Sequence, residues 1–127
     1  MITGGTGGIG NAFAEAFLNL ISALAQPAYS AAKTGIVSLT KSLAISFAED
    51  GIHVNAIAPG WIKTEMTRAL REDPELSEFN NKVLARIPGG QWAEAEDLTG
   101  AAIFLASAAS KLINGVTIPV DGGYCAS

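Results

Sequence analysis

The sequence predicts an α/β fold in which a parallel sheet is flanked by helices. Three observations support this prediction. A glycine-rich turn over residues 4–10 precedes a helical pattern, and strand-like and helix-like segments alternate from there to the C-terminus. Apolar residues make up 49% of the chain and charged residues only 16%, against about 25% charged residues in average domains. The length of 127 residues fits one domain, so we expect a single domain over residues 1–127.

The composition also limits the classes of binding partner that we expect. The low charge content indicates either a sheet covered on both faces or a surface covered by another subunit. The net charge is −4, and the eight Lys and Arg residues are scattered, which argues against nucleic acid as a ligand. Cys125 is the only cysteine and has no metal-binding neighbours in sequence, so no metal and a reducing compartment, the cytoplasm, are expected. We expect no secretion signal and no membrane span.

The first half of the chain predicts a helix over 11–17, a short buried strand over 19–24 and a long helix over about 28–50. In the long helix, apolar residues recur at three- and four-residue steps and form one stripe: Ile36, Leu39, Leu43 and Phe47. Gly51 follows as a left-handed C-cap.

The second half predicts a strand over 53–58 that ends at Pro59-Gly60. The polar residues 61–92 predict a short helix, a break at Pro74 and another short helix to about Arg86. A helix over 94–107, with its inward face formed by Leu98, Ala101, Ala102 and Leu105, precedes a last strand over 115–120. Asp121-Gly122-Gly123 closes this strand as a turn.

The glycine-rich turn is the first candidate site. Thr3-Gly4-Gly5-Thr6-Gly7-Gly8-Ile9-Gly10 opens the first helix, and glycines at such a turn allow the backbone to approach a pyrophosphate at the helix N-terminus. The alternative is a flexible N-terminal tail, because only Met1-Ile2 precedes the turn as a strand.

Tyr29 and Lys33 are the second candidate. Four residues apart on a helix, both side chains lie on one face. An ammonium beside a phenol favours the phenolate, which could exchange a proton with a carbinol oxygen during hydride transfer. The alternative is an ordinary surface pair at the same spacing.

Read together, the motifs are more specific. The glycine turn, Tyr29-Ser30-Ala31-Ala32-Lys33, the segment Val54-Asn55-Ala56-Ile57-Ala58-Pro59-Gly60-Trp61-Ile62-Lys63-Thr64 and Val120-Asp121-Gly122-Gly123 occur in this order. The set resembles the short-chain dehydrogenase/reductases, and the resemblance is nearly continuous over residues 27–123. It implies a truncated Rossmann-like fold and an NAD(P)-dependent oxidoreductase acting on an alcohol or carbonyl, such as a sugar acid, polyol or oxoacyl group.

The resemblance also implies roles for individual residues. Tyr29 matches the catalytic acid/base, and Lys33 matches the residue that holds the nicotinamide ribose and tunes the tyrosine. The other positions that match cofactor-binding residues are Thr3, Gly4, Gly8, Ile9, Gly10, Pro59, Gly60, Ile62 and Thr64. Residues 65–86 match the mobile substrate-covering region, Asn55 a structural link between loops, and the Asp121 turn a region near a subunit contact.

The chain departs from this family between Gly10 and Tyr29. Eighteen residues separate them, whereas one βαβ unit needs roughly 30. The central part of the Rossmann domain is therefore expected to be missing, together with the residue that discriminates NAD from NADP and with the crevice geometry that a complete sheet provides.

The serine that polarises the substrate carbonyl in this family is missing as well. Ser22, seven residues before Tyr29, is better explained as a hydroxyl at a strand edge. Two functions therefore remain open: an NAD(P)-dependent oxidoreductase, or a non-catalytic remnant that acts as an oligomerising module. The long helix and the last strand resemble the family's interface elements, so a homo-oligomer is expected. A third interpretation is an incomplete gene product.

Overall fold

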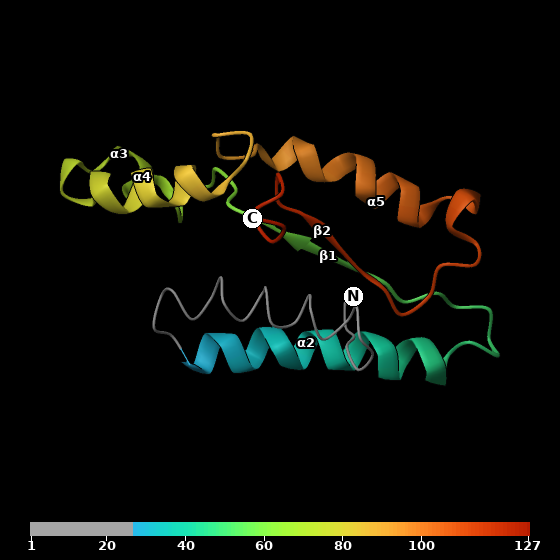
Figure 1. Ribbon diagram of the computed structural model, residues 1–127. Coiled ribbons are helices and arrows are strands. Elements are labelled where there is room, and N and C mark those ends of the chain that lie inside the picture. Colours follow the sequence, from blue (N-terminus) through green and yellow to red (C-terminus); the bar gives the residue numbers. More distant parts are fainter. Residues whose placement is uncertain (1–26) are drawn as a thin grey trace.

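The computed structural model describes residues 27–127 of the chain. In Figure 1, two strands lie between a long helix on one side and a shorter helix on the other. The elements follow one another as α2 (Pro27–Ser46), β1 (Ala56–Pro59), α3 (Arg68–Glu72), η1 (Pro74–Leu76), α4 (Ser77–Arg86), η2 (Ala95–Leu98), α5 (Thr99–Ala106), η3 (Ala108–Ser110) and β2 (Thr117–Val120). The expected α/β class is confirmed, with α2 and α5 on opposite sides of the strands.

The two strands pair in parallel, as the sequence predicts. Ala56 lies opposite Thr117 and Pro59 opposite Val120. Both strands are shorter than expected. The amides of Val54 and Val116, before β1 and β2, donate to the side chains of Asn114 and Asn55 instead of to a neighbouring strand. Within residues 27–127 the sheet consists of these two strands. So short a sheet buries little apolar surface by itself and needs cover on its faces.

Helix α2 ends earlier than the pattern suggests. Its last helical residue is Ser46, and turns carry the chain from there to Gly51. The Ile52 amide donates to the Phe47 carbonyl at 3.2 Å and the Gly51 amide to the Ala48 carbonyl at 3.1 Å. This pair of bonds is a Schellman motif, and Gly51 has a φ of 71°. The predicted left-handed cap at Gly51 is therefore confirmed.

The side of α2 that is buried is not the predicted apolar stripe. Thr40 and Ala44 are buried, with 0% and 4% of their surfaces exposed, whereas Ile36, Leu39 and Phe47 are exposed. Small side chains allow the helix backbone to approach its neighbours closely, and the larger apolar side chains are left at the surface. A similar correction applies to the helix predicted over 94–107, where Ala102 is exposed and Leu98, Ala101 and Leu105 are partly buried.

Two asparagines tie the loops before the strands together. Asn55 donates to the Ile113 carbonyl at 2.8 Å and accepts from the Val116 amide at 3.1 Å. Asn114 accepts from the Val54 amide and donates to the Ala44 carbonyl at 3.0 Å, which joins β1, β2 and the end of α2. The expected structural role of Asn55 is confirmed.

The polar stretch after β1 folds as the sequence predicts. Helix α3 stops at Glu72, and Pro74 begins the single turn η1, where the Asp73 side chain accepts from the Glu75 amide at 2.9 Å. Helix α4 then ends at Arg86, the predicted residue. The next helix is interrupted: η2 has a capping box between Glu94 and Asp97, and only 99–106 are α-helical.

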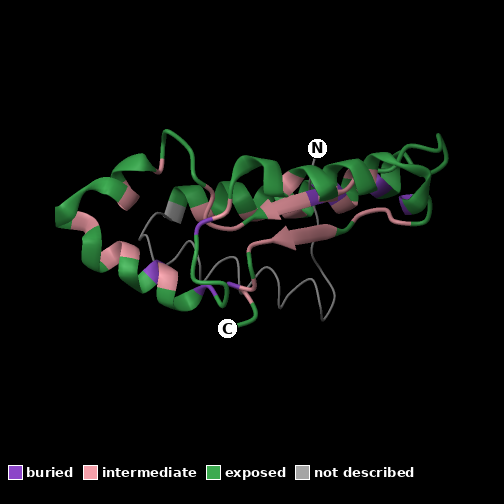
Figure 2. Cartoon of the chain, turned by 90° about the horizontal axis from the view of Figure 1, so that it is seen from above, coloured by how far each residue is buried: buried purple, intermediate pink, exposed green. Residues whose placement is uncertain are grey.

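The main buried cluster lies between α4 and the C-terminal turn. Its buried members are Val83, Ile87, Trp92 and Tyr124, and Trp61 and Phe79 pack against them. Trp61 contacts Trp92 edge-on, with ring centroids 5.0 Å apart, and Phe79 and Tyr124 at 5.9 and 6.2 Å. Much of the remaining ribbon is exposed in Figure 2, so this cluster is the principal apolar contact of the described residues.

Two general properties of residues 27–127 bear on function. None of their helices combines the length and hydrophobicity that crossing a bilayer requires. Within the same range, histidine, cysteine and carboxylate side chains do not gather in groups that could hold a metal ion.

Candidate active site

The carboxyl ends of both strands point toward one end of the molecule. Figures 1 and 2 show that α3, α4 and the beginning of α2 lie at this same end. In open parallel α/β sheets, ligands bind outside the carboxyl ends of the strands. The architecture therefore gathers the candidate residues of α2 and of the segment after β1 at the end where a ligand is expected.

Tyr29 and Lys33 lie on one face of the first turns of α2, as their spacing predicts. The Lys33 ammonium lies over the Tyr29 ring, with its Nζ 5.2 Å from the ring centroid. This distance fits a cation–π contact. Tyr29 is 46% exposed, so its ring presents a large accessible area at this end of the helix.

Pro59 and Gly60 mark the end of β1. Pro59 is the last residue of the strand and is exposed, and the Gly60 amide donates to the Val120 carbonyl at 3.0 Å. Gly60 packs directly against the chain after β2: a Cβ at this position would lie 2.6 Å from the Asp121 Cα and 2.7 Å from its Cβ. Glycine is required here because the two backbones approach each other too closely for a side chain.

Asp121 in turn organises the C-terminal turn. Its carboxylate accepts from the amides of Gly123 and Cys125, at 2.9 and 3.0 Å. Gly122 and Gly123 have φ values of 63° and 86°, which residues with a side chain rarely adopt. The predicted turn is confirmed, and it packs on Ile87 and Pro88 after α4.

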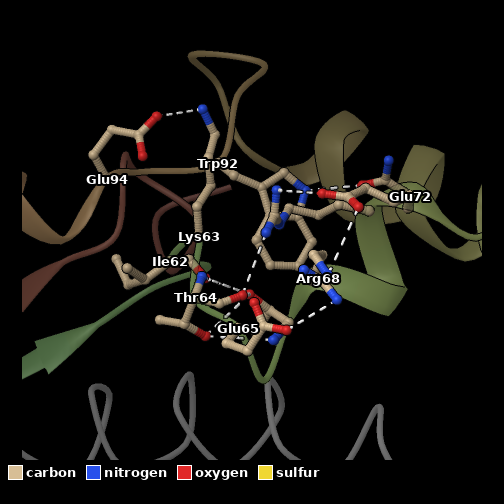
Figure 3. A network of polar contacts seen from close by, with 11 residues as sticks. Ile62, Lys63, Thr64, Glu65, Arg68, Glu72, Trp92 and Glu94 are labelled. Carbon is tan, nitrogen blue, oxygen red and sulfur yellow. Dashed lines mark hydrogen bonds and ion pairs between the residues drawn. The ribbon is translucent and has the colours of Figure 1, made fainter.

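Ile62 and Thr64 follow in a loop that is bonded on two sides (Figure 3). On one side, the Ala93 amide donates to the Trp61 carbonyl at 2.9 Å and the Lys63 amide to the Ala93 carbonyl at 2.8 Å. The Lys63 ammonium also pairs with the Glu94 carboxylate. The loop is therefore held to the chain that leads into η2.

On the other side, Thr67 holds the loop. Its hydroxyl donates to the Ile62 carbonyl at 2.8 Å and accepts from the Thr64 amide at 3.0 Å. The Thr64 hydroxyl lies 3.2 Å from that of Thr67 and is exposed. Thr64 thus presents a fixed hydroxyl to solvent at the beginning of the α3–α4 segment.

Sequence reasoning missed the residues that support this loop from outside it: Arg71, Asn80 and Trp92. The Trp92 indole donates to the Asn80 side chain at 2.8 Å, and an Arg71 amino group donates to the Thr64 carbonyl at 3.3 Å. The available signal was weak, because the two tryptophans flank the polar stretch but nothing in their spacing pairs them.

Thr3, Gly4, Gly8, Ile9 and Gly10 lie outside the described residues, as do the helix expected over 11–17 and the strand expected over 19–24. Among the described residues, the beginning of α2, the end of β1 and the following loop lie toward the same end of the molecule.

Cys125 follows the Asp121-Gly122-Gly123 turn, and its amide donates to the Asp121 carboxylate. Burial, together with the hydrogen bond and negative charge of Asp121, raises the pKa of its thiol to about 12, and the Arg86 charge opposes this only in part. A raised pKa keeps the thiol neutral and therefore a poor nucleophile near neutral pH.

We expect the alkylation rate of Cys125 by iodoacetamide to stay low in the folded protein across the pH range in which the urea-unfolded chain becomes reactive. The pKa of the thiol is near its ordinary value of 9.0 in the unfolded chain and about 12 in the folded protein. Stability from the neutral thiol is therefore complete below about pH 9 and is lost as the pH rises toward 12. Coincident rate–pH profiles for the folded and unfolded chains would contradict this environment.

Comparison with known proteins connects this geometry to a family. A family model described as Enoyl-(Acyl carrier protein) reductase matches residues 16–125. A 2-dehydro-3-deoxy-D-gluconate 5-dehydrogenase of Bacillus subtilis is 49% identical over 98 residues, which cover 77% of this chain and 37% of that protein.

Solved structures give the same result. A crystal structure from Agrobacterium tumefaciens, provisionally identified as a 2-deoxy-d-gluconate 3-dehydrogenase with bound NADP, is 50% identical with a TM-score of 0.73. It is matched over 80% of this chain and 40% of its own. A gluconate 5-dehydrogenase of Burkholderia cenocepacia in complex with NADP and tartrate is 44% identical, with a TM-score of 0.67, over 77% of this chain and 38% of its own.

These matches identify the family and show how much of a typical relative this chain covers. The chain spans about two-fifths of the length of the relatives it matches. The family model covers most of the chain, including the whole range from Tyr29 to Thr64. This sequence therefore belongs to the short-chain dehydrogenase/reductase family.

Proposed function

We propose that the protein is, or forms part of, an NAD(P)-dependent oxidoreductase that interconverts an alcohol and a carbonyl on a sugar-acid substrate. The proposal is supported by the Tyr29–Lys33 pair at the beginning of α2, which lies toward the same end of the molecule as the carboxyl ends of the two parallel strands. The sugar-acid class is supported by relatives named for gluconate and 2-dehydro-3-deoxy-D-gluconate.

In this proposal, Tyr29 exchanges a proton with the substrate oxygen. The Lys33 ammonium lies over the Tyr29 ring, 5.2 Å from its centroid. A tyrosinate can accept a proton from an alcohol, and the phenol can return it to a carbonyl oxygen. When bound, the nicotinamide cofactor supplies the hydride chemistry. Lys33 and the Thr64 hydroxyl are the donors that would orient it, because both are exposed at the same end of the fold.

The donor set fits a dinucleotide. An ammonium and a hydroxyl suit ribose hydroxyls and a carboxamide, and Gly60 allows the strand end to lie flat against β2. Pro59, Gly60 and Ile62 then position Thr64, while Thr3, Gly4, Gly8, Ile9 and Gly10 are proposed for the pyrophosphate. NAD and NADP are both compatible with these residues, and relatives bind NADP.

A titration of the protein with NADH and with NADPH, followed by nicotinamide fluorescence, tests the proposal. We expect saturable binding of one of them with a Kd in the micromolar range. With the corresponding oxidised cofactor, NAD⁺ or NADP⁺, we expect oxidation of D-gluconate or of 2-dehydro-3-deoxy-D-gluconate at the carbon-5 alcohol. Bovine serum albumin at equal concentration controls for adventitious fluorescence changes. If the protein showed no cofactor binding and no turnover, the proposed function would be wrong.

A second candidate is an oligomerising module without catalysis; a homo-oligomer is proposed under either candidate. The observation in its favour is the exposure of Ile36, Leu39, Ile45 and Phe47 on and after α2, with Ile45 77% exposed. Light scattering separates the two candidates. Stable oligomers without cofactor affinity favour the module, whereas a monomer with micromolar cofactor affinity excludes it. For either candidate, we propose a single unit over residues 1–127 located in the cytoplasm.

A further inference from the structure

Arg71 has an unusual environment for a residue of α3. None of the five residues of this helix is fully buried, yet the Arg71 side chain is only 20% exposed. Its guanidinium carbon lies 6.0 Å from the centroid of the Trp92 ring. The indole of Trp92 is itself fixed by Asn80 of α4, so Arg71 packs on an immobilised surface.

The polar contacts of Arg71 satisfy its guanidinium poorly. One amino group donates to the Thr64 carbonyl at 3.3 Å, the other lies 3.9 Å from the Glu72 carboxylate, and the buried Nε has no hydrogen-bond partner. Burying a guanidinium in this way is unfavourable for stability, and a well-packed apolar residue would serve as well or better. The observed contact with Thr64 therefore points to a role other than stabilising the fold.

Thr64 is the residue that this contact reaches. Its amide and hydroxyl are bonded to Thr67, and its carbonyl accepts from the Thr67 amide and hydroxyl as well as from Arg71. Arg71 is the side chain from α3 that joins Thr64 to Trp92 of the main buried cluster. Such a link fixes the position of the Thr64 hydroxyl relative to the covering helices.

Arg68, one turn earlier on α3, provides the contrast. Its side chain is 58% exposed and pairs with Glu65 and Glu72, at 3.0 and 3.9 Å. Figure 3 shows these pairs beside the Thr64 loop. Exposed ion pairs of this kind contribute little to the stability of the fold. The two arginines share a helix and a charge but differ in burial and in contact with Thr64.

We propose that Arg71 is a positioning residue that holds Thr64 in its binding orientation and couples it to the covering segment of α3 and α4. This inference rests on the proposed function, in which Thr64 helps to bind the cofactor. It predicts an effect on cofactor affinity and on local opening of the 62–68 loop, with little effect on the global stability of the protein.

The experiment compares Arg71→Met with the matched control Arg68→Met in the full chain. For Arg71→Met we expect the Kd of the bound nicotinamide cofactor to rise about tenfold, as loss of a hydrogen bond from a charged group implies. The amides of Thr64 and Thr67 should exchange with deuterium about tenfold faster, while amides of β1 and β2 exchange unchanged. Arg68→Met should alter neither measurement.

Arg71→Lys guards against misfolding of the methionine variant. It keeps a buried cation over Trp92 but lacks the planar fork, so it should restore part of the cofactor affinity and of the amide protection. Equal behaviour of the Arg71 and Arg68 variants would overturn the proposal. If the unmodified chain binds neither NADH nor NADPH, the proposed function fails, and the exchange of Thr64 and Thr67 still decides whether Arg71 holds the loop.

Discussion

Replacing Tyr29 with phenylalanine is expected to lower kcat about a thousandfold while the Kd of the cofactor changes by less than about fivefold. The substitution removes only the hydroxyl, and a positioned proton donor contributes roughly 10²–10⁴-fold to a rate. The aromatic ring and the Lys33 ammonium over it remain, so helix α2 should keep its stability. Steady-state kinetics with saturating sugar acid, together with a fluorescence titration, measure both quantities.

Ser38→Ala is the matched control for Tyr29→Phe. It deletes an exposed hydroxyl from the same helix, nine positions further along, and should leave kcat and the melting temperature unchanged. If Tyr29→Phe turned over at the rate of the unmodified chain, another group would have to move the proton, and the Tyr29 assignment would be wrong.

Among glycine-to-alanine substitutions in the described part of the chain, Gly60→Ala should lower the free energy of unfolding most. The added Cβ would overlap the Asp121 backbone at 2.6 Å, and both backbones there are fixed by the bond from the Gly60 amide to the Val120 carbonyl. Overpacking between two backbones cannot be relieved by a rotamer change, so we expect a loss of about 3 kcal/mol in the free energy of unfolding. Urea denaturation followed by circular dichroism gives the value.

Gly89→Ala provides the comparison for Gly60→Ala. Nothing lies within 4 Å of a Cβ at Gly89, which is exposed in the turn after α4. The change should therefore fall within about 0.5 kcal/mol of the parent protein. Equal urea midpoints for the two variants would show that the strand end can move apart from Asp121, against the close approach described above.

The sequence predicted those features that depend on a few neighbouring residues, such as helix ends and turns. Gly51 as a helix cap, the break at Pro74 and the end of α4 at Arg86 follow from backbone preferences of a few neighbouring residues. The parallel pairing of the strands follows from their alternation with helices. The placement of Tyr29 and Lys33 on one face follows from the helical repeat alone.

Long-range choices were not predictable from the same signals. Helix α2 buries Thr40 and Ala44 although the periodicity favoured the stripe of larger apolar residues, because the close approach of α2 selects small side chains. The contact of Arg71 with Thr64 and that of Asp121 with Gly60 join segments whose proximity depends on the whole arrangement. Nothing in either segment alone encodes its partner.

The edge-on packing of Trp61 on Trp92 has a practical consequence. These are the only two indoles of the chain, and they lie together in the cluster between α4 and the C-terminal turn. Tryptophan fluorescence of the unlabelled protein therefore reports on this one region. A ligand that binds next to it is expected to change the wavelength and intensity of that fluorescence, so stopped-flow mixing could time the binding without an introduced dye.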